Sequence, residues 1–349
     1  MGIKQLSKVI KDNSKKGIKE RSLGFYADKK VCIDASMFIY QFLIAVRSDG
    51  ASLGTEDNTT SHIVGMFYRT IRLVEAGVTP VYVFDGAPPE SKMFELKKRT
   101  ERREKAEEGF KKAEEGGDKQ EMEKFEKRKI KVGKEHVEDC KTLLKLMGIP
   151  FITAPSEAEA FCAYLCMKNY ADGVATEDMD ALTFGAPLVL RNFTASQAKK
   201  VPVLEYDLGT ILKEMGLSMD EFIDLCILLG CDYSETLKGI GIKRSVGLIK
   251  KYRSIEKILE KEDIKEEEIK KFNFEDARAI FKELPFLEAE VSEFKIQWEE
   301  IKVEEIKKFL VEEKKFGEQR VTKGVEKLLA ARKRPKQGRL DQFFKIVPK

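Results

Sequence analysis

Acidic residues stand at, or just beyond, the ends of short apolar runs along this chain, and this arrangement constrains its fold more than any other feature. Three of these runs read VCID, VYVFD and LLGCD. The segments between the first runs have the apolar spacing of helices, and such alternation is typical of an α/β fold with a mostly parallel central sheet and helices on both faces. Ligands bind at the carboxyl ends of strands in such a sheet. We therefore expect one cluster of seven acids: Asp34, Asp85, Glu157, Glu159, Asp178, Asp180 and Asp232.

The residue pattern also places the strands that carry the first acids. Runs of β-branched and aromatic residues predict strands over 29–34 and 78–86, and helical spacing predicts helices over 35–46 and 61–76. Two of the later acids, in TEDMD, are two residues apart, so in an extended segment both side chains would point the same way. We expect the second of them, Asp180, at a solvent-accessible strand end.

Seven carboxylates at one edge would repel each other unless cations separate them. Two like charges 4 Å apart cost about 4 kcal/mol at an effective dielectric constant near 20. The chain has two histidines, and its six cysteines show no CxxC spacing, so the available ligands are mostly oxygen atoms. Oxygen ligands select hard ions such as Mg²⁺ or Mn²⁺, and two such ions about 4 Å apart can bind the attacking water and the leaving oxygen of a phosphodiester. The acids therefore predict a two-metal site.

Several of these acids also have a structural interpretation that needs no metal. Asp34 could be the N-cap of the helix that follows it. Ser156 and Glu159 have the spacing of a capping box, and Asp85 with Gly86 is a common turn dipeptide. Any single acid is weak evidence, and the metal interpretation depends on the position that all seven share.

Composition excludes several classes of protein. A chain of 349 residues suggests about two structural units. Hydrophobic residues make up 42% of it, and 64 basic against 60 acidic residues leave a net charge of +4, which excludes wholesale disorder and a uniformly basic protein. No apolar run approaches the roughly 18 residues of a membrane-spanning helix, and the start lacks the apolar core of a secretory signal. The cysteine spacing indicates buried free thiols in a reducing compartment.

Residues 90–134 interrupt the strand and helix alternation with a highly charged helical segment in which basic residues outnumber acidic ones. We interpret it as an inserted helical arch that projects into solvent. Lys92, Arg99 and Arg103 fall on one face of its first helix. That face could clamp phosphates and stabilise charge at the scissile group, or it could be an ordinary solvated face.

A glycine turn, KGIGIKRS, lies between two helical stretches and resembles a helix-hairpin-helix (helix-two-turn-helix) unit over 218–252. Backbone amides in such turns can approach phosphate closely, and the next helix N-terminus adds its dipole. The turn would position a DNA duplex without reading its sequence. The residues in question are Gly239, Gly241, Lys243 and Arg244.

The last fifteen residues form a polar tail that contains two adjacent phenylalanines. Aromatic residues of this kind in a flexible tail indicate docking into a hydrophobic pocket, although the tail could instead fold back on its own domain. The residues that give this spacing are Gln337, Leu340, Phe343 and Phe344.

With these motifs in view, the chain resembles the flap endonuclease family in its eukaryotic form, a group of XPG-type structure-specific 5′ nucleases. The matching blocks include VCIDASMFIYQFLIAVR, VYVFDGAPP, LMGIPFITAPSEAEA, ATEDMDALTFGAP and QGRLDQFF, and they occur in order along essentially the whole chain. The resemblance implies a PIN-like nuclease core. It also implies a Mg²⁺-dependent enzyme that removes 5′ flaps in Okazaki fragment maturation and long-patch base excision repair, with 5′-3′ exonuclease activity on nicked or gapped DNA.

The resemblance also implies roles for individual residues. One Mg²⁺ would be held by Asp34, Asp85, Glu157 and Glu159, and a second by Asp178, Asp180 and Asp232, with Mn²⁺ as a substitute. Lys92, Arg99 and Asp180 would act in catalysis, and Tyr40 would stack on a nucleobase. Residues expected to contact DNA are Gly2, Arg47, Arg69, Glu157, Gly230, Asp232, Gly239, Gly241, Lys243, Arg244, Lys314 and Arg320.

Further expectations from the resemblance concern partners and location. The hairpin would also bind K⁺, and the tail would bind the sliding clamp PCNA, which the chain would engage as a monomer. The family is nuclear, in nucleolus and nucleoplasm, and mitochondrial in part. Two rivals are a related repair-bubble or mismatch exonuclease and a DNA-junction-binding protein without catalysis.

The chain is also expected to divide into five regions. We expect an N-terminal nuclease region over 1–104, the arch over 90–134, an internal nuclease region over 121–252, a C-terminal helical region over 253–334 and the clamp-binding tail over 335–349.

Overall fold

The protein is described from a computed structural model. It covers residues 2–48, 60–88, 92–116, 118–195, 200–282 and 296–333. The tail residues predicted to bind the clamp, Gln337, Leu340, Phe343 and Phe344, lie outside these ranges. Within them, no helix is long and apolar enough to cross a membrane.

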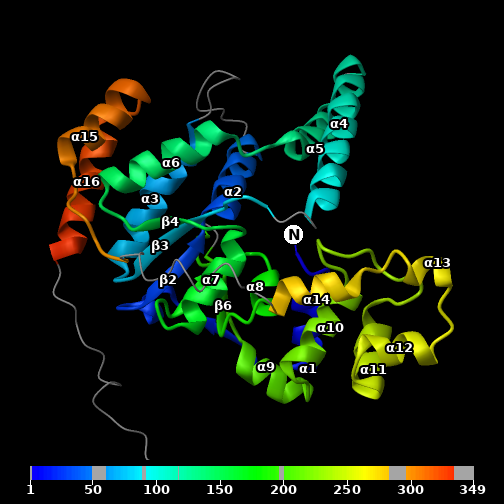
Figure 1. The fold of residues 1–349 in the computed structure, drawn as a ribbon. Coiled ribbons are helices and arrows are strands. Elements are labelled where there is room, and N and C mark those ends of the chain that lie inside the picture. Colours follow the sequence, from blue (N-terminus) through cyan, green and yellow to red (C-terminus); the bar gives the residue numbers. More distant parts are fainter. Residues whose placement is uncertain are drawn as a thin grey trace, which may run out of the picture.

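A seven-stranded sheet forms the centre of the molecule, in the order β1-β7-β6-β5-β2-β3-β4 (Figure 1). The five strands from β6 to β4 are parallel, whereas β7 is antiparallel to both β6 and β1. The predicted mostly parallel sheet is confirmed, and its two antiparallel pairings are the two that β7 makes. The strands are β1 (Ile18–Arg21), β2 (Lys30–Asp34), β3 (Thr79–Phe84), β4 (Phe151–Thr153), β5 (Gly173–Ala175), β6 (Leu188–Arg191) and β7 (Val203–Asp207).

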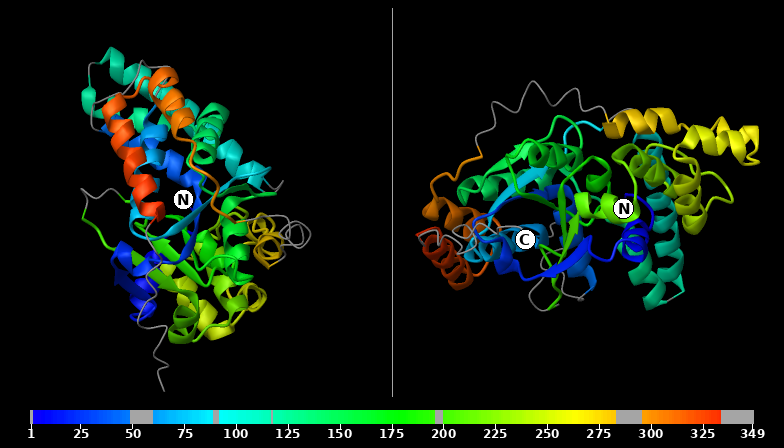
Figure 2. Two further views of the ribbon diagram at one scale, coloured as in Figure 1. Left: turned by 90° about the vertical axis from the view of Figure 1, so that its left-hand side faces the viewer. Right: turned by 90° about the horizontal axis from the view of Figure 1, so that it is seen from below.

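Alternate residues of the central strands bury two separate helical layers, as the side-chain period of a strand requires. Val81 and Val83 of β3 pack into the layer built on α1, α7, α8, α9 and α10. Tyr82 and Phe84 pack into the opposite layer, which contains α2, α3, α6 and α16 (Figures 1 and 2). These helices are α1 (Leu6–Asn13), α2 (Ala35–Ser48), α3 (Ser61–Glu75), α6 (Lys134–Leu146), α7 (Ala158–Met167), α8 (Asp180–Thr183), α9 (Leu208–Met215), α10 (Met219–Leu229) and α16 (Glu318–Lys333).

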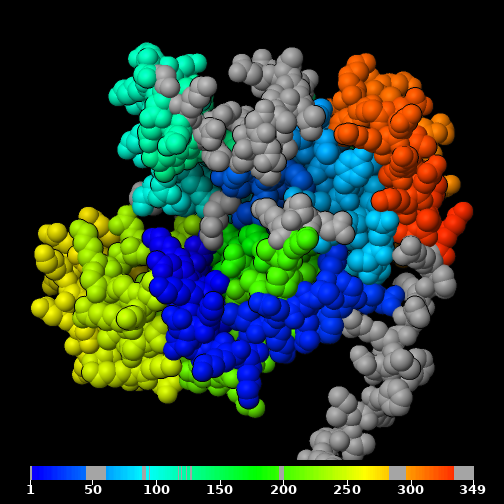
Figure 3. Space-filling view, turned by 180° about the vertical axis from the view of Figure 1, so that it is seen from behind, coloured from blue at the N-terminus to red at the C-terminus, as the bar shows by residue number. Residues whose placement is uncertain are grey.

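Two long charged helices leave this body and pack against each other, α4 (Met93–Glu115) and α5 (Lys119–Lys129). They project from one end of the molecule (Figures 1 and 3). Gly109 allows their close approach, because a Cβ atom there would lie 2.6 Å from the ring of Phe125. The predicted insertion is therefore a helical pair, which we call the arch.

The remaining helices extend the body on both sides. On the α10 side lie α11 (Ile242–Tyr252), α12 (Ile255–Lys261), α13 (Glu266–Ile269) and α14 (Phe274–Lys282). On the other side, α15 (Val303–Lys307) leads through a π-helical turn into α16, which packs on α3. The domain boundaries given above stay predictions.

Candidate active site at the carboxyl edge of the sheet

Four neighbouring strands deliver six of the seven predicted acids to one edge. Asp34 is the last residue of β2, and Asp85 directly follows β3. Asp178 and Asp180 follow β5, and Glu157 and Glu159 lie at the start of α7, after β4. Because β5, β2, β3 and β4 are neighbours in the sheet, the acids at their carboxyl ends lie at the same edge. Asp232 is different: it follows helix α10, so its expected position at a strand end is wrong.

Asp34 has a structural contact in addition to its place at this edge. Its Oδ1 accepts a hydrogen bond of 2.9 Å from the Met37 N–H, which makes it the N-cap of α2. Its Oδ2 accepts from the Thr176 hydroxyl at 3.3 Å. Burial, and then the charge of Asp85, raises the pKa of Asp34 to about 7. The N-cap interpretation is therefore confirmed, and it coexists with an unfavourable electrostatic environment.

The other two structural interpretations are wrong. Helix α7 begins at Ala158 with Glu157 as its N-cap, so Ser156 and Glu159 do not form a capping box. Asp85 itself supplies the capping contact, because its Oδ1 accepts from the Ala158 N–H at 2.9 Å. Gly86 forms no turn with it and instead donates its N–H to Ser156 O at 2.6 Å.

Asp178 and Asp180 do not lie in an extended segment, so the predicted reason for their side chains pointing the same way is wrong. Asp180 is the first residue of α8, and its N–H donates to Asp178 Oδ1 at 3.3 Å. It is 1% exposed, so the expected solvent-accessible position is also wrong. The chain start covers the pair: the Ile3 N–H donates to Asp180 Oδ1 at 2.6 Å, and a Cβ on Gly2 would collide with both carboxylates.

Two cations from the base of the arch enter this cluster. Lys92 Nζ binds Glu157 Oε1 and lies 3.8 Å from Glu159 and 3.9 Å from Asp232. Arg99 binds Asp232 Oδ2 through Nη2. Burial lowers the pKa of Lys92, but the charges of Glu159 and Asp232 more than offset burial and raise it. Ion pairs of Lys92 and Arg99 therefore connect the base of the arch to the acids.

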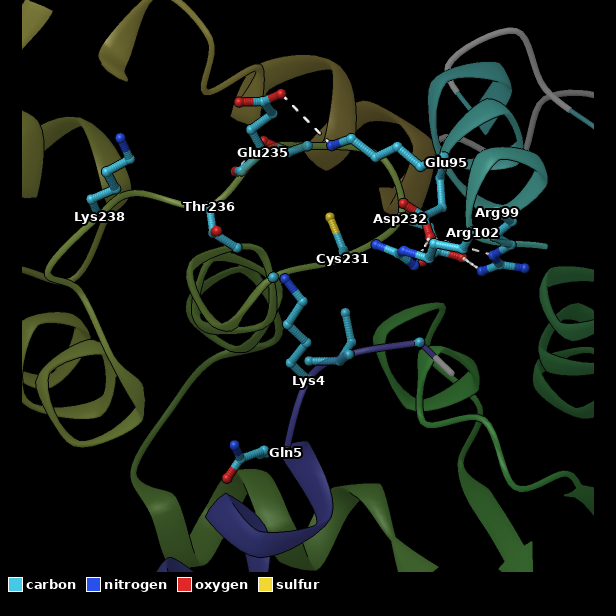
Figure 4. Close-up of a pocket in the computed structure, with 15 residues that line it drawn as sticks. Lys4, Gln5, Glu95, Arg99, Arg102, Cys231, Asp232, Glu235, Thr236 and Lys238 are labelled. Carbon is cyan, nitrogen blue, oxygen red and sulfur yellow. Dashed lines mark hydrogen bonds and ion pairs between the residues drawn. The ribbon is translucent and has the colours of Figure 1, made fainter. Parts of the chain in front are cut away.

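Glu95 fixes Arg99 from the other side. Its Oε1 lies 3.4 Å from Arg99 Nε and 3.3 Å from Arg102 Nη1 (Figure 4). Glu95 was not among the predicted site residues, because it lies in a run of charged residues. The signal that could have found it is its position four residues before Arg99, which is the spacing of a helical ion pair.

Two cavities meet at Asp232 and Arg99. One, of about 770 Å³, lies under the arch and is lined by Tyr40, Phe125 and Arg128 as well as by the cations and five of the acids. The other, of about 570 Å³, lies beside the chain start and contains Gly2, Gly230 and several lysines (Figure 4). Asp232 is therefore accessible from both cavities, whereas Asp34, Asp85, Glu159 and Asp178 line only the one under the arch.

The electrostatics of the acid cluster favour the binding of a cation. Burial, and then the charge of Asp178, raises the pKa of Glu159 and of Asp180 well above the usual values. Asp180 Oδ2 is buried and has no hydrogen-bond partner among the described residues. A buried carboxylate oxygen without a donor is costly, and a hard divalent ion is the ligand that such an oxygen prefers.

The acids are nevertheless not preassembled around one point. In the described part of the chain, no three side chains among His, Cys, Asp and Glu lie close enough together to form a metal site as they stand. Lys92 and Arg99 occupy oxygens of Glu157 and Asp232 instead. Metal binding would therefore require these two cations to give way.

Tyr233 is a second site residue that was not predicted from the sequence. Its hydroxyl donates to Glu157 Oε2, and the residue is 5% exposed. The signal was its place directly after Asp232 in LLGCDY.

The predicted hairpin lies between α10 and α11. Gly239 has a positive φ of 76°, and Gly241 is the N-cap of α11. Lys243 and Arg244 follow on its first turn and are exposed, although Arg244 is also bound to Glu262 at 2.6 Å. Two glycines and a helix N-terminus thus face solvent, as a contact with a phosphate backbone requires.

The remaining predicted DNA contacts lie away from the acids. Arg69 stacks its guanidinium 4.0 Å from the centroid of the Phe42 ring and, with exposed Arg320, lines a cavity of about 1000 Å³ between α3 and α16. Lys314 is bound to Asp139 at 2.6 Å. The side chain of Arg47 lies outside the described part of the structure.

Two protein-family models match the parts of the chain that contain the site. The model of the XPG N-terminal domain matches residues 1–106, and that of the XPG I-region matches residues 148–232. These two ranges contain all seven acids together with Lys92 and Arg99.

Relatives match over nearly the full length. Flap endonuclease 1 of Encephalitozoon cuniculi (strain GB-M1) is 60% identical over 344 residues, which is 99% of each chain. Flap endonuclease 1 of Homo sapiens is 50% identical over 349 residues, covering 99% of this chain and 91% of the human one.

Solved structures of related nucleases also match nearly the whole chain. Flap endonuclease-1 from Methanococcus jannaschii superposes with a TM-score of 0.68 at 33% identity, covering 90% of this chain and 96% of that one. The catalytic core of Rad2 in complex with a DNA substrate gives a TM-score of 0.67 at 26% identity, over 94% of this chain and all of the other. The chain therefore belongs to the flap endonuclease 1 family of XPG-type nucleases.

Proposed function

We propose that this chain is a structure-specific nuclease that cleaves 5′ flaps of branched DNA and acts as a 5′-3′ exonuclease on nicked or gapped DNA. Members of its family hydrolyse DNA phosphodiester bonds, and the proposal assigns that chemistry to the carboxyl edge of the sheet. The observation that carries it is the position of Lys92 and Arg99, which enter the acid cluster from the arch and line the same cavity. Okazaki fragment maturation and long-patch base excision repair are the pathways that need this reaction.

The donor set supports two divalent ions, Mg²⁺ or Mn²⁺. Asp34, Asp85, Glu157 and Glu159 would hold one ion, and Asp178, Asp180 and Asp232 would hold the other. When bound, two such ions supply the charge that activates an attacking water and stabilises the leaving oxygen. The buried Asp180 oxygen without a donor is the best single reason to expect a cation there.

The chain's own residues bind and orient the substrate. Lys92 and Arg99 place two positive charges where negative charge develops on the scissile phosphate, and such fixed charges stabilise transition states strongly. Half-buried Tyr40 lines the same cavity and presents a ring on which an unpaired base can stack. Exposed Arg128 lies on the arch side of the cavity and can guide the flap backbone.

The hairpin positions the duplex through its backbone. Gly239, Gly241 and the first turn of α11 offer N–H groups and exposed cations to phosphates, and a K⁺ ion at the turn would strengthen this contact. Arg69 and Arg320 provide a second, distant basic surface for the other duplex arm.

The proposals for partner and location rest on the resemblance to the family. We propose that the chain acts as a monomer, binds the sliding clamp PCNA through Gln337, Leu340, Phe343 and Phe344, and works in the nucleus, with a mitochondrial fraction. Replacing Phe343 and Phe344 by alanine should abolish clamp binding in calorimetry, because aromatic anchors carry most interface energy. Cleavage of free flap DNA should not change.

Cleavage of a labelled double-flap substrate, with and without Mg²⁺, tests the function. We expect metal-dependent incision at the flap base and much slower cleavage of a bubble or of mismatched duplex. Tight, metal-independent binding without cleavage would identify a junction-binding protein instead. Preference for the bubble or mismatch would identify one of the related nucleases.

A further inference from the structure

Tyr233 makes one polar contact with the acid cluster, and the contact is specific. Its hydroxyl donates to Glu157 Oε2, while Lys92 Nζ binds the other oxygen, Oε1. An ionised carboxylate only accepts hydrogen bonds, so the phenol must be the donor. Both oxygens of Glu157 are therefore held, one by an aromatic residue of the body and one by a cation of the arch.

The ring that carries this hydroxyl is fixed by other aromatic residues. It meets Phe184 edge to face at 6.4 Å between centroids and Phe281 at 5.2 Å. Phe184 is the C-cap of helix α8, whose first residue is Asp180, and Phe281 belongs to α14. Because both neighbouring rings meet Tyr233 edge to face, they restrict the movement of its ring and hold the hydroxyl beside Glu157 Oε2.

The position of Tyr233 also links two parts of the acid cluster. It follows Asp232 directly, and it reaches a carboxylate 76 residues earlier in the chain. A shift of the loop after α10 would therefore move Asp232 and the donor to Glu157 together.

We propose that Tyr233 is a positioning residue for Glu157. Its hydroxyl restrains Oε2, so that Oε1, the oxygen that Lys92 binds, is the one presented to a divalent ion when Lys92 gives way. This inference rests on the proposed function, because it assigns Glu157 to a metal. Partners that orient a metal ligand typically change metal affinity or activity by 10- to 100-fold.

Tyr233→Phe removes the hydroxyl and keeps the ring, so it tests the contact without opening a cavity. The matched control is Tyr82→Phe, which removes the buried hydroxyl that bonds Thr70 at 2.7 Å on the opposite face of the sheet. The first readout is the melting temperature during a Ca²⁺ titration without DNA, because Ca²⁺ also prefers oxygen ligands. We expect Tyr233→Phe to raise the Ca²⁺ concentration for half of the full stabilisation at least tenfold, and Tyr82→Phe to leave it unchanged.

Cleavage of double-flap DNA gives the second readout. The Mg²⁺ concentration for half-maximal rate should rise by a similar factor in Tyr233→Phe, whereas the rate at saturating Mg²⁺ should recover most of its value. In a Glu157→Gln background, Tyr233→Phe should change the Ca²⁺ midpoint by less than threefold, because the restrained ligand is already gone.

Three outcomes would overturn the proposal. Equal Ca²⁺ midpoints for Tyr233→Phe and Tyr82→Phe would leave Tyr233 with a packing role only. The full tenfold effect persisting in the Glu157→Gln background would place its action elsewhere. A wild-type protein that Ca²⁺ does not stabilise would remove the ion from the inference, even if flap cleavage were normal. Failure of wild-type cleavage with intact Ca²⁺ behaviour would instead count against the proposed function alone.

Discussion

Asp85 and Asp180 stand at the same edge of the sheet, yet their carboxylates are in opposite situations. Asp85 is exposed and caps α7 through its contact with the Ala158 N–H. Asp180 is buried beside other acids, and one of its oxygens has no donor among the described residues. The first residue contributes to the fold as it stands, whereas the second raises the free energy of the folded state. The comparison distinguishes an acid that stabilises the fold through a hydrogen bond from an acid whose buried charge needs a cation to offset it.

The largest expected effect comes from neutralising Asp180. Asp180→Asn should reduce flap cleavage in Mg²⁺ to background, because the side chain can no longer supply a charged ligand. Its melting temperature without metal should not fall and should rise slightly, since burial and neighbouring charges raise the pKa of this group and make its ionised form costly. Asn keeps an acceptor for the Ile3 N–H.

Two measurements on the purified variant decide the matter, calorimetric melting in a chelator and flap cleavage in Mg²⁺. Cleavage at the wild-type rate would end the two-metal assignment. A large fall in melting temperature would show that the buried carboxylate supports the fold after all.

The cations of the arch come next. Lys92→Ala or Arg99→Ala should slow single-turnover cleavage by about 10²-fold, the usual cost of losing one fixed charge at the reacting group. Affinity for flap DNA should change much less, because many other cations contact phosphates. Exposed Lys97 on the same helix supplies the control, and Lys97→Ala should cleave normally. A large loss of affinity with normal chemistry would make Lys92 and Arg99 ordinary phosphate contacts.

Glu95 should show a smaller effect through Arg99. A hydrogen bond to a charged group contributes about 1.5 kcal/mol, and partial exposure weakens it, so Glu95→Gln should slow cleavage by less than about tenfold. Glu101→Gln changes an exposed acid of the same helix and should have no effect. If Arg99→Ala removes the effect of Glu95→Gln, the two residues act together. Independent effects would assign Glu95 to the stability of α4.

Local sequence was enough to predict the edge, because β2 is a buried apolar run that ends in Asp34 and β3 is one that Asp85 directly follows. It could not predict β1, whose residues IKER are mostly polar and pair with β7 far along the chain. The contact of Tyr233 with Glu157 depends on how α7, α8 and α10 pack, which no local spacing encodes. The burial of Asp180 was missed for the same reason, since the chain start that covers it lies 177 residues away.

The smallest expected effect separates the capping role of Asp85 from its charge. Asp85→Ala removes the acceptor for the Ala158 N–H and should cost about 1 kcal/mol, as other lost helix caps do. In a protein of this size that is a fall of about 2 °C in melting temperature. Asp85→Asn keeps an oxygen at the same place, so it should melt like the wild type. Both variants should lose flap cleavage, because neither supplies a carboxylate to a metal. If Asp85→Asn melts as low as Asp85→Ala, the charge and not the hydrogen bond stabilises the start of α7, and Asp85 would then differ from Asp180 only in its exposure.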